Sequence, residues 1–414
     1  MENTVIIGGG IIGFSTAFYL SESPHTDART IHVVEVSREL FNCASGLAGG
    51  FLASDWFSPS VSSLGALSFR LHKELAEQHE GREKWGYSMS TGTSLESEGG
   101  DAESAVGGSG EDFLRNGTSR ANAAGLHEFK SGEGPAWLTR AADTRLEVIS
   151  QPGSVAQIDP KRLCQFLLEQ CSSRGVQLHQ PAQVISVSPD TTGAFASVRI
   201  LSADGVETDL PCTRLVIAAG AWTRKVFAGL FPSAEVNLPI SALAGHSILV
   251  KSPRWSKEHE TSGCHAIFAT DVNGFSPEIF SRLGEEVYIA GLNSSSIPLP
   301  ELPTDVEARP EAIEKLKGVA AKMLGLSDDE NDIQILREGL CFRPVCSTGR
   351  PVIARVPDEQ LGDIKTREGT QGGVFVAAGH GAWGISHSLG TGKLMTELLE
   401  GQKLSADIKR LTTF

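Results

Sequence analysis

Residues 4–13 read Thr-Val-Ile-Ile-Gly-Gly-Gly-Ile-Ile-Gly, and this stretch decides the fold. Its first four residues are a mostly apolar, β-branched run of the kind that forms a fully buried parallel strand. The glycines after them mark a tight turn, and residues 14–21 carry a helical pattern. A second apolar run over residues 31–35 completes a sequence of strand, turn, helix and strand. This order predicts a Rossmann-type βαβ unit.

The glycines at positions 8, 10 and 13 follow the spacing of a dinucleotide-binding turn. Gly8 permits the tight turn, Gly10 lets the backbone approach a diphosphate, and Gly13 lets the helix pack closely on the strand. The helix N-terminus then offers N–H donors and a positive dipole to that diphosphate. Glu35 lies 22 residues after Gly13, where a carboxylate can accept hydrogen bonds from a ribose and would repel a 2′-phosphate. The contacts predicted for this unit are Ile7, Gly8, Gly10, Ile11, Ile12, Gly13, Glu35 and Val36.

The composition is that of an ordinary globular protein, with 40% hydrophobic and 21% charged residues in a chain of 414. A net charge of -14 argues against a nucleic-acid partner and an anionic membrane surface, because both are bound through clustered Lys and Arg. The seven cysteines contain no CxxC pair, so we expect free thiols and no metal site. No apolar run reaches the roughly 18 residues of a membrane span, and we expect no signal peptide. These features predict a cytoplasmic protein without an integral membrane segment and leave its oligomeric state undetermined.

The rest of the chain alternates strand and helix patterns, and its length predicts two domains. Between about residues 92 and 134 the composition shifts to Gly, Ser, Glu and Ala, which predicts a flexible insertion. Pro160 marks a helix start after Asp159. The other predicted elements are strands at 184–187, 196–201, 215–220 and 374–378, a mixed β region at 240–291, and helices at 311–323 and 386–399.

Four further segments occur in an order that is typical of one flavoprotein family. They are the small-residue run 43–50 after the second strand, Gln-Ile-Asp-Pro at 157–160, the strand 216–222, and Gly379-His380-Gly381 with Gly390. Together they resemble the D-amino-acid oxidase (DAO) family, near its glycine and sarcosine oxidases. The resemblance covers nearly the whole chain apart from the 92–134 insertion.

This resemblance implies FAD as cofactor and an α/β (α+β) fold, in which a Rossmann-type FAD-binding domain is interleaved with an antiparallel-sheet substrate domain. The expected FAD-binding domain comprises residues 1–90, 150–235 and 336–414, and the substrate domain comprises 91–149 and 236–335. Small residues near Ser45 would let the backbone lie against the flavin. The further cofactor contacts that the resemblance implies are Ser45, Gly46, Ala48, Gly49, Gly50, Val184, Ala219, Gly220, Trp222, Cys341, Gly379, His380, Gly381, Trp383, Gly384 and Ile385.

DAO-family members pass a hydride from an amine carbon to flavin and leave an imine, which implies a small amine or amino acid as substrate. Arg343 occupies the position that clamps the substrate carboxylate in D-amino-acid and glycine oxidases, a role that suits a guanidinium fork. A structural arginine is the alternative. Cys341 falls where sarcosine and fructosyl-amine oxidases bond covalently to the flavin, with a buried unreactive thiol as the alternative. His380 is a candidate for proton transfer or for contact with the flavin.

The electron acceptor stays open because the sarcosine-oxidase branch activates oxygen with a lysine, and residues 261–314 contain none. Arg282 is the cation in the best-matching stretch. The tail 379–392 looks like fungal DAO-family proteins of undefined substrate that are associated with endosome-to-Golgi traffic. A second hypothesis is therefore an endosome-associated, FAD-binding trafficking or interaction protein with little or no turnover.

Overall fold

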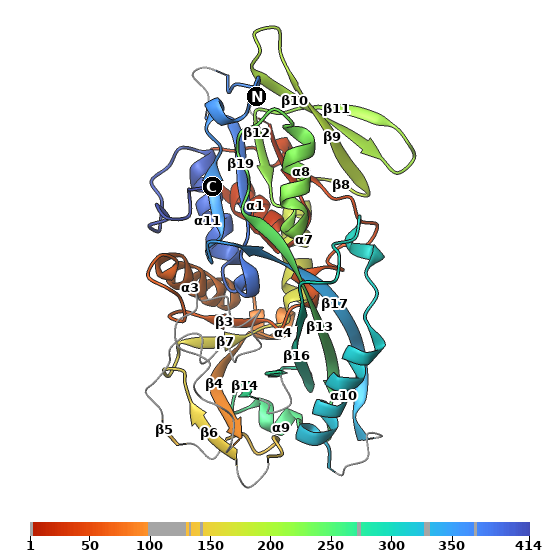
Figure 1. Ribbon diagram of the computed structural model, residues 1–414. Coiled ribbons are helices and arrows are strands. Elements are labelled where there is room, and N and C mark those ends of the chain that lie inside the picture. Colours follow the sequence, from red (N-terminus) through yellow and green to blue (C-terminus); the bar gives the residue numbers. More distant parts are fainter. Residues whose placement is uncertain are drawn as a thin grey trace.

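The computed structural model describes residues 3–97, 130–131, 134–140, 144–270, 275–326, 332–367 and 371–414. The molecule is elongated, with a parallel sheet and its helices at one end and a larger mixed sheet at the other (Figure 1). Strands from the N-terminal, central and C-terminal parts of the chain meet in the parallel sheet, so the chain crosses between the two ends more than once.

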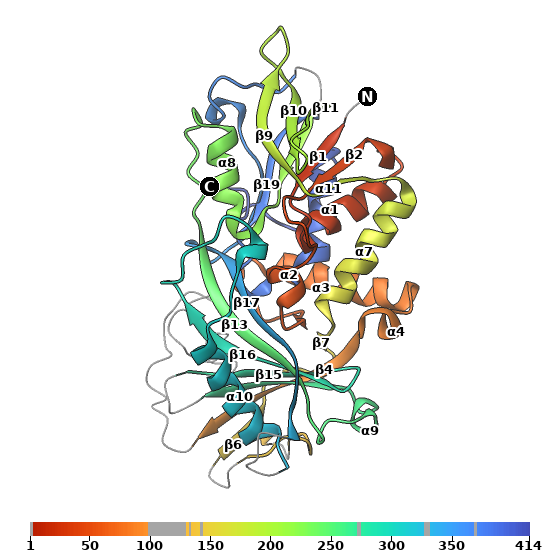
Figure 2. The ribbon, with the colours of Figure 1, turned by 90° about the vertical axis from the view of Figure 1, so that its right-hand side faces the viewer.

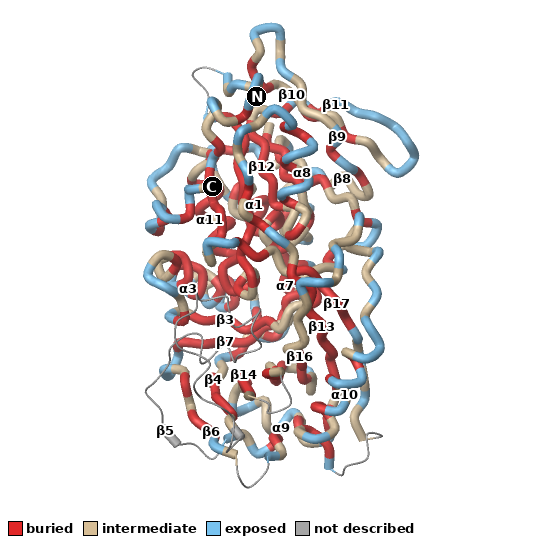
Figure 3. Tube along the Cα trace, viewed as in Figure 1, coloured by how far each residue is buried: buried red, intermediate tan, exposed pale blue. Residues whose placement is uncertain are grey.

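The parallel sheet has six strands in the order β18-β19-β12-β1-β2-β8. All neighbours run parallel except β18, which is antiparallel to β19. The central strands are buried along their whole length, as expected for apolar runs covered on both faces (Figure 3). The strands are β1 (Thr4–Ile7), β2 (Ile31–Val34), β8 (Gln177–His179), β12 (Arg214–Ile217), β18 (Val352–Arg355) and β19 (Gly373–Ala378).

Helices cover one face of this sheet, and a small sheet with one helix covers the other (Figure 2). On the first face α1 contacts both α7 and α11, and a Cβ on Gly392 of α11 would lie 2.5 Å from the Ser15 carbonyl oxygen of α1. The helices of this face are α1 (Ile11–Glu22), α3 (Ser62–Gln78), α4 (Gly81–Trp85), α7 (Pro160–Arg174) and α11 (Ser388–Leu399). On the second face lie the antiparallel strands β9 (Ala182–Pro189), β10 (Phe195–Ser202) and β11 (Glu207–Pro211), with α8 (Thr223–Leu230).

The larger sheet follows the order β17-β13-β16-β15-β14-β4-β6-β5, with β3 and β7 paired beside it. Its neighbours are antiparallel except for the parallel pair of β4 and β14. Helix α10 (Pro310–Leu324) packs its apolar face on this sheet. The strands are β3 (Phe51–Ala53), β4 (Ser88–Ser97), β5 (Lys130–Ser131), β6 (Thr144–Val148), β7 (Val155–Gln157), β13 (Ile240–Lys251), β14 (Cys264–Thr270), β15 (Glu278–Arg282), β16 (Glu286–Ser294) and β17 (Gln334–Cys346). The structure also has the short α-helices α2 (Ala44–Leu47) and α9 (Lys257–Glu260). Its 3-10 helices are η1 (Ala28–Thr30), η3 (Gly220–Trp222), η4 (Pro303–Asp305), η6 (Asp358–Gln360) and η7 (Gly381–Trp383).

This architecture confirms the predicted mixture of a Rossmann-type sheet and a largely antiparallel sheet. The predicted helix start is also confirmed, because the Asp159 carboxylate caps α7 by accepting hydrogen bonds from the Lys161 and Arg162 amides at 2.9 and 3.2 Å. Helix α3 was not predicted from its sequence, although its buried face packs against α11.

Two predicted boundaries differ from the structure. Residues 92–97 belong to β4, where they pair with β6 and β14, so a flexible insertion starting at 92 begins too early. Most of that insertion, 98–129, lies outside the described residues. The boundary proposed at residue 336 falls inside β17, which pairs with β13 over nearly its whole length. The division into two domains stays a proposal.

Candidate cofactor and substrate cavity

A cavity of about 550 Å³ lies where the parallel sheet meets the larger sheet. The turn after β1, the end of β2, the turn after β12 and the segment around α2 form one side of it. Strands β15, β16 and β17 form the other side. The cavity therefore collects side chains that are distant in the sequence, as expected at the carboxyl edge of an open α/β sheet.

The glycine turn after β1 has the close contacts that its sequence predicts. Gly8 has φ of 111°, a conformation that favours glycine, and a Cβ there would lie 2.5 Å from the Ala218 carbonyl oxygen. A Cβ on Gly13 would lie 2.0 Å from the Gly8 carbonyl oxygen, so any side chain would push α1 away from the turn. The Ile11 amide, at the first position of α1, donates to the Ser45 hydroxyl at 2.9 Å. Ile11 and Ile12, the first residues of α1, both line the cavity, so the N-terminus of this helix borders it.

The Glu35 carboxylate closes the end of β2 beside this turn. It accepts hydrogen bonds from the Gly9 and Ser37 amides, both at 2.8 Å. A carboxylate offers about four acceptor positions, so these two bonds fix its orientation and leave acceptor capacity for a ligand hydroxyl. The structure thus places Glu35 as the sequence predicts, lining the cavity next to Gly8 and Gly10.

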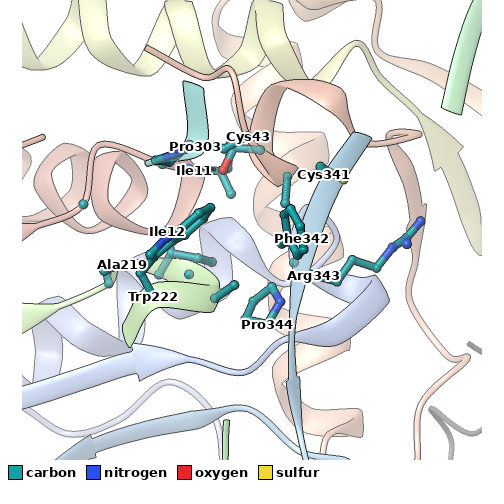
Figure 4. Close-up of a pocket in the computed structure, with 18 of the residues that line it drawn as sticks. Ile11, Ile12, Cys43, Ala219, Trp222, Pro303, Cys341, Phe342, Arg343 and Pro344 are labelled. Atoms are coloured by element: carbon teal, nitrogen blue, oxygen red, sulfur yellow. Dashed lines mark hydrogen bonds between the residues drawn. The ribbon is translucent and has the colours of Figure 1, made fainter. Parts of the chain in front are cut away.

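Arg343 lies on β17 and reaches past Gly245 of β13. Its Nη1 atom donates to the Asn293 side-chain oxygen of β16 at 2.7 Å. A Cβ on Gly245 would lie 1.8 Å from this Nη1 atom, so glycine makes the space that the guanidinium occupies. Figure 4 shows Arg343 on the opposite side of β17 from Phe342 and Pro344. One guanidinium nitrogen is therefore anchored, and half-buried Arg343 is among the residues that line the cavity.

Aromatic side chains cover the part of the cavity on the larger sheet. Phe51, Phe280 and Tyr288 line it, and the rings of Phe280 and Tyr288 stack with centroids 6.0 Å apart. Burial raises the pKa of Tyr288, while Arg343 nearby acts to lower it. Glu278, at the start of β15, adds a carboxylate to the same lining. This side of the cavity is therefore mostly apolar, with Arg343 and Glu278 as its charged groups.

His380 is buried and is a poor base in this setting. Burial lowers its pKa to about 3, and its Nε2 atom lies 3.0 Å from the Thr391 hydroxyl. The ring is therefore neutral at physiological pH and is already bonded within the protein. It lines the cavity beside Gly381, so its position favours contact with a ligand over proton transfer.

Cys341 lines the cavity on β17, and burial raises the pKa of its thiol. The charges of Arg343 and Arg337 act in the opposite direction. Thiolate is the reactive form of cysteine, so this environment favours an unreactive thiol.

Arg282 does not line the cavity. Its Nε and Nη2 atoms donate to the Gly49 carbonyl oxygen at 3.0 and 2.7 Å, and Nη2 also donates to the Ala48 carbonyl oxygen at 2.5 Å. Arg282, the cation of the best-matching stretch, is therefore buried behind the backbone and lies outside the cavity lining.

The structure brings most of the predicted site residues to this one cavity. Those that line it are Ile7, Gly8, Gly10, Ile11, Ile12, Glu35, Val36, Ser45, Ala48, Gly49, Gly50, Val184, Ala219, Gly220, Trp222, Cys341, Arg343, His380, Gly381, Gly384 and Ile385. Four others lie outside its lining. Gly13, Gly46 and Gly379 are packing positions where a side chain would meet backbone or neighbouring side chains. Trp383 is buried among aromatic residues, with its ring 4.8 Å from that of Phe57.

Several lining residues were not predicted from the sequence. The apolar and small ones include Cys43, Ala44, Phe51, Ala182, Ile185, Val226, Phe280, Tyr288, Leu302, Pro303, Phe342, Pro344 and Ala382. Successive side chains of a strand point to opposite faces, so the sequence of β17 could have indicated that Phe342 and Pro344 face the side opposite to Arg343. Phe280 and Tyr288 carry no local signal, because only the pairing of β15 with β16 brings their rings together.

A second unpredicted part of the wall is the connection from β16 to α10. Glu301, Leu302 and Pro303 of this connection line the cavity, and Pro303 is labelled in Figure 4. The Trp222 indole donates to the Pro300 carbonyl oxygen at 2.8 Å. Trp222 therefore forms the wall and holds the connection over the parallel sheet.

The cavity fits FAD on three observations. The Gly8 to Gly13 turn leaves no room for side chains where a diphosphate would approach. Glu35 is held at the end of β2 with acceptor capacity for a ribose. The α2 segment brings bare backbone at Gly49 and Gly50 to the cavity, with room for a flat ring system.

The sequence matches the family described as FAD dependent oxidoreductase (DAO) over residues 3–398. This chain belongs to the DAO family. It is 29% identical over 425 residues to a Schizosaccharomyces pombe protein named "Putative oxidoreductase C1F5.03c", covering 99% of this chain and 97% of the relative. Its fold matches glycine oxidase from Geobacillus kaustophilus with a TM-score of 0.71 and 21% identity, over 100% of this chain and 98% of the other. It also matches L-proline dehydrogenase from P. horikoshii with a TM-score of 0.72 and 14% identity, over 99% and 96%.

As a DAO-family protein, the chain is an FAD-dependent oxidoreductase related to amino-acid and amine oxidases. Within the described residues, no helix is long and apolar enough to cross a membrane. The same residues contain no cluster of three or more His, Cys, Asp or Glu side chains that could hold a metal ion.

Proposed function

We propose that this DAO-family protein oxidises a small amine that carries a carboxylate, such as an α-amino acid, to the corresponding imine. The observation that carries the proposal is Arg343, a half-buried guanidinium in the cavity whose Nη1 atom is anchored by Asn293. An anchored fork can present its other donors to both oxygens of a carboxylate. The guanidinium of a purely structural arginine would more commonly form an ion pair with a carboxylate or be exposed to solvent.

The chain's own residues would bind and orient the substrate. Arg343 would hold the carboxylate, and Phe51, Phe280 and Tyr288 would exclude water from the reacting carbon. Bound FAD would supply the hydride acceptor. Burial lowers the pKa of His380 to about 3, so its ring is a neutral imidazole at neutral pH and is too weak a base to remove a proton from an ammonium group. We therefore infer that the substrate enters with its amine already neutral.

The electron acceptor stays a separate proposal. Arg282, the cation of the stretch where the sarcosine-oxidase branch would carry its lysine, is bonded to the Ala48 and Gly49 carbonyls. This observation favours an acceptor other than dioxygen, or slow turnover. The second candidate function is therefore an FAD-binding protein with little turnover, and an association with endosomes belongs to that candidate alone.

A substrate panel under anaerobic conditions tests the proposal without assuming an acceptor. Glycine, sarcosine, D-amino acids and fructosyl amines are each mixed with the FAD-loaded protein, and bleaching of the flavin band at about 450 nm is followed. We expect at least one carboxylate-bearing amine to bleach the flavin. Failure of every compound would favour the low-turnover candidate.

Arg343→Ala tests the role of the guanidinium. We expect kcat/KM for carboxylate substrates to fall roughly 100-fold, since a charged hydrogen-bonded pair contributes about 1.5–3 kcal/mol. The kcat/KM of the variant for matched amines without a carboxylate should change little. An equal loss on both classes would contradict the clamp.

A further inference from the structure

Arg282, at the end of β15, is a buried cation whose bonds go to backbone carbonyls. Its side chain is 2% exposed. Among the described residues, no carboxylate oxygen lies within ion-pair distance of its guanidinium. Burying a charge without a bonded counter-charge is costly. The position therefore calls for an explanation beyond packing.

The hydrogen bonds of Arg282 converge on one short segment of backbone. The Gly49 carbonyl oxygen accepts from Arg282 Nε at 3.0 Å, from Arg282 Nη2 at 2.7 Å and from the Gln157 side-chain amide at 2.6 Å. The Ala48 carbonyl oxygen accepts from Arg282 Nη2. A second arginine, Arg337, donates to the Gly46 carbonyl oxygen at 3.0 Å. The bonded carbonyls of Gly46, Ala48 and Gly49 therefore hold this segment from the side of the larger sheet.

The amides of the same peptide units point the other way. In a trans peptide the C=O and N–H groups are antiparallel. Because the Ala48 and Gly49 carbonyls face Arg282, the Gly49 and Gly50 amides face away from it, on the side of the cavity that these residues line. Within the described part of the chain, neither amide donates a hydrogen bond. Backbone donors in a folded protein are normally paired, so this pair is available to a ligand.

No side chain could replace this bare backbone. A Cβ on Gly49 would lie 2.7 Å from the Phe280 ring, and Gly50 has φ of 86° with a Cβ position 2.0 Å from the Ile158 carbonyl oxygen. Hydrogen bonding at a carbonyl also polarises the N–H of its peptide unit. The segment therefore presents two polarised donors, backed by a fixed positive charge.

We propose that Arg282 is a positioning residue for the flavin ring, holding the Gly49 and Gly50 amides toward the cavity and adding positive potential behind them. The expected consequence is that the protein stabilises negative charge on the bound ring. The proposal rests on FAD binding and not on any amine substrate, so it can fail or hold independently of the function proposed above.

Sulfite affinity measures this property directly. Sulfite adds to the oxidised ring, leaves it negatively charged and bleaches its absorbance at about 450 nm, so its dissociation constant reports stabilisation of that charge. A unit charge about 10 Å away changes such a constant roughly tenfold in a protein interior. We expect R282Q, loaded with FAD at pH 8, to bind sulfite about tenfold more weakly, with a two-electron potential lower by about 30 mV. R282K, which keeps the charge, should stay within about threefold of the parent.

Two further variants separate charge from position. Q157L removes a neutral donor from the same Gly49 carbonyl, so it loosens the segment without changing its charge. E286Q neutralises half-buried Glu286, which lies opposite Arg282 in the pairing of β15 with β16. Burial lowers the pKa of Arg282, and the charge of Glu286 acts to raise it. We expect Q157L to leave sulfite affinity near the parent value and E286Q to strengthen it severalfold.

Parent-like sulfite binding by R282Q would overturn the proposal, and so would an equal weakening in Q157L. If R282Q does not fold or bind FAD, the pair R282K and E286Q decides. Retained affinity in R282K with tighter binding in E286Q supports the role of the charge. Weakening in R282K together with no change in E286Q refutes it.

Discussion

Gly245→Ala displaces the Arg343 guanidinium without touching its charge. A Cβ at this position would lie 1.8 Å from Nη1, 2.7 Å from Cζ and 2.9 Å from the Asn293 side-chain oxygen. Non-bonded heavy atoms need about 3.5 Å, so the guanidinium must move by roughly 1.5 Å or more. Such a shift breaks its bond to Asn293 and turns the fork away from its present direction.

The expected cost follows from the interaction that is lost. A hydrogen bond to a charged group contributes about 1.5–3 kcal/mol, which corresponds to a fall of roughly 10- to 150-fold in kcat/KM for a carboxylate substrate. The matched measurement is the same ratio for an amine without a carboxylate, which should stay within about threefold. FAD content should be unchanged, because Gly245 lies outside the cavity lining.

Gly339→Ala is the control, on the same strand as Arg343. A Cβ there would meet the Ser247 hydroxyl at 3.4 Å and Leu47 at 3.5 Å, which are ordinary contacts. We expect parent-like kinetics on both substrate classes. Retention of carboxylate turnover in Gly245→Ala, with the protein folded and loaded with FAD, would refute Arg343 as the carboxylate site.

Three further predictions concern the cofactor and the buried ionisable groups. Glu35→Gln should raise the Kd for FAD roughly tenfold, because a charged acceptor for the ribose becomes neutral; fluorescence titration measures this, and Glu39→Gln, an exposed neighbour, should not change it. Burial lowers the pKa of His72 to about 4 in the folded protein, whereas its pKa in the unfolded chain is near 6.5. The stability that neutral His72 contributes is therefore complete above pH 6.5 and is lost as the pH falls toward 4. In urea unfolding, the free energy of unfolding should therefore fall by about 2 kcal/mol less between pH 8 and pH 5 in His72→Gln than in the parent. In the control His25→Gln, at an exposed position, it should fall as much as in the parent. Acid precipitation should release the yellow colour into the supernatant, because burial keeps the Cys341 thiol protonated; colour retained by the pellet, and lost from it in Cys341→Ala, would show a covalent bond instead.

The βαβ unit could be predicted from sequence because its determinants are local. Gly8 and Gly13 contact each other within one turn, so the steric requirement for glycine appears as a fixed spacing along the chain. Glu35 follows at the end of the next parallel strand, at a separation set by one helix and two turns. The same reasoning predicted the cap at Asp159, where the side chain and the amides it binds are neighbours in sequence.

Sequence also predicted which residue types would meet at the cavity, but not all of their roles. Arg282 and Arg343 are both arginines on strands of the larger sheet. Nothing in their local sequence indicates that the first is buried and bonded to backbone carbonyls, whereas the second lines the cavity. The two arginines differ because Arg282 donates hydrogen bonds to the carbonyl of Gly49, which lies more than two hundred residues earlier in the chain. Arg343 on β17 instead donates a hydrogen bond to Asn293 on β16, and these two strands are brought together by β13, which pairs with both.

The amino-acid sequence by itself determined the Rossmann-type turn and its acidic partner, since short-range sterics and charge decide these features. Tertiary structure alone decided which cations reach the cavity, which aromatic rings wall it, and that the Gly49 and Gly50 amides have no hydrogen-bond acceptor among the described residues. The physical reason is that strand register joins distant segments, and a shift of one residue would turn each side chain to the opposite face of the sheet.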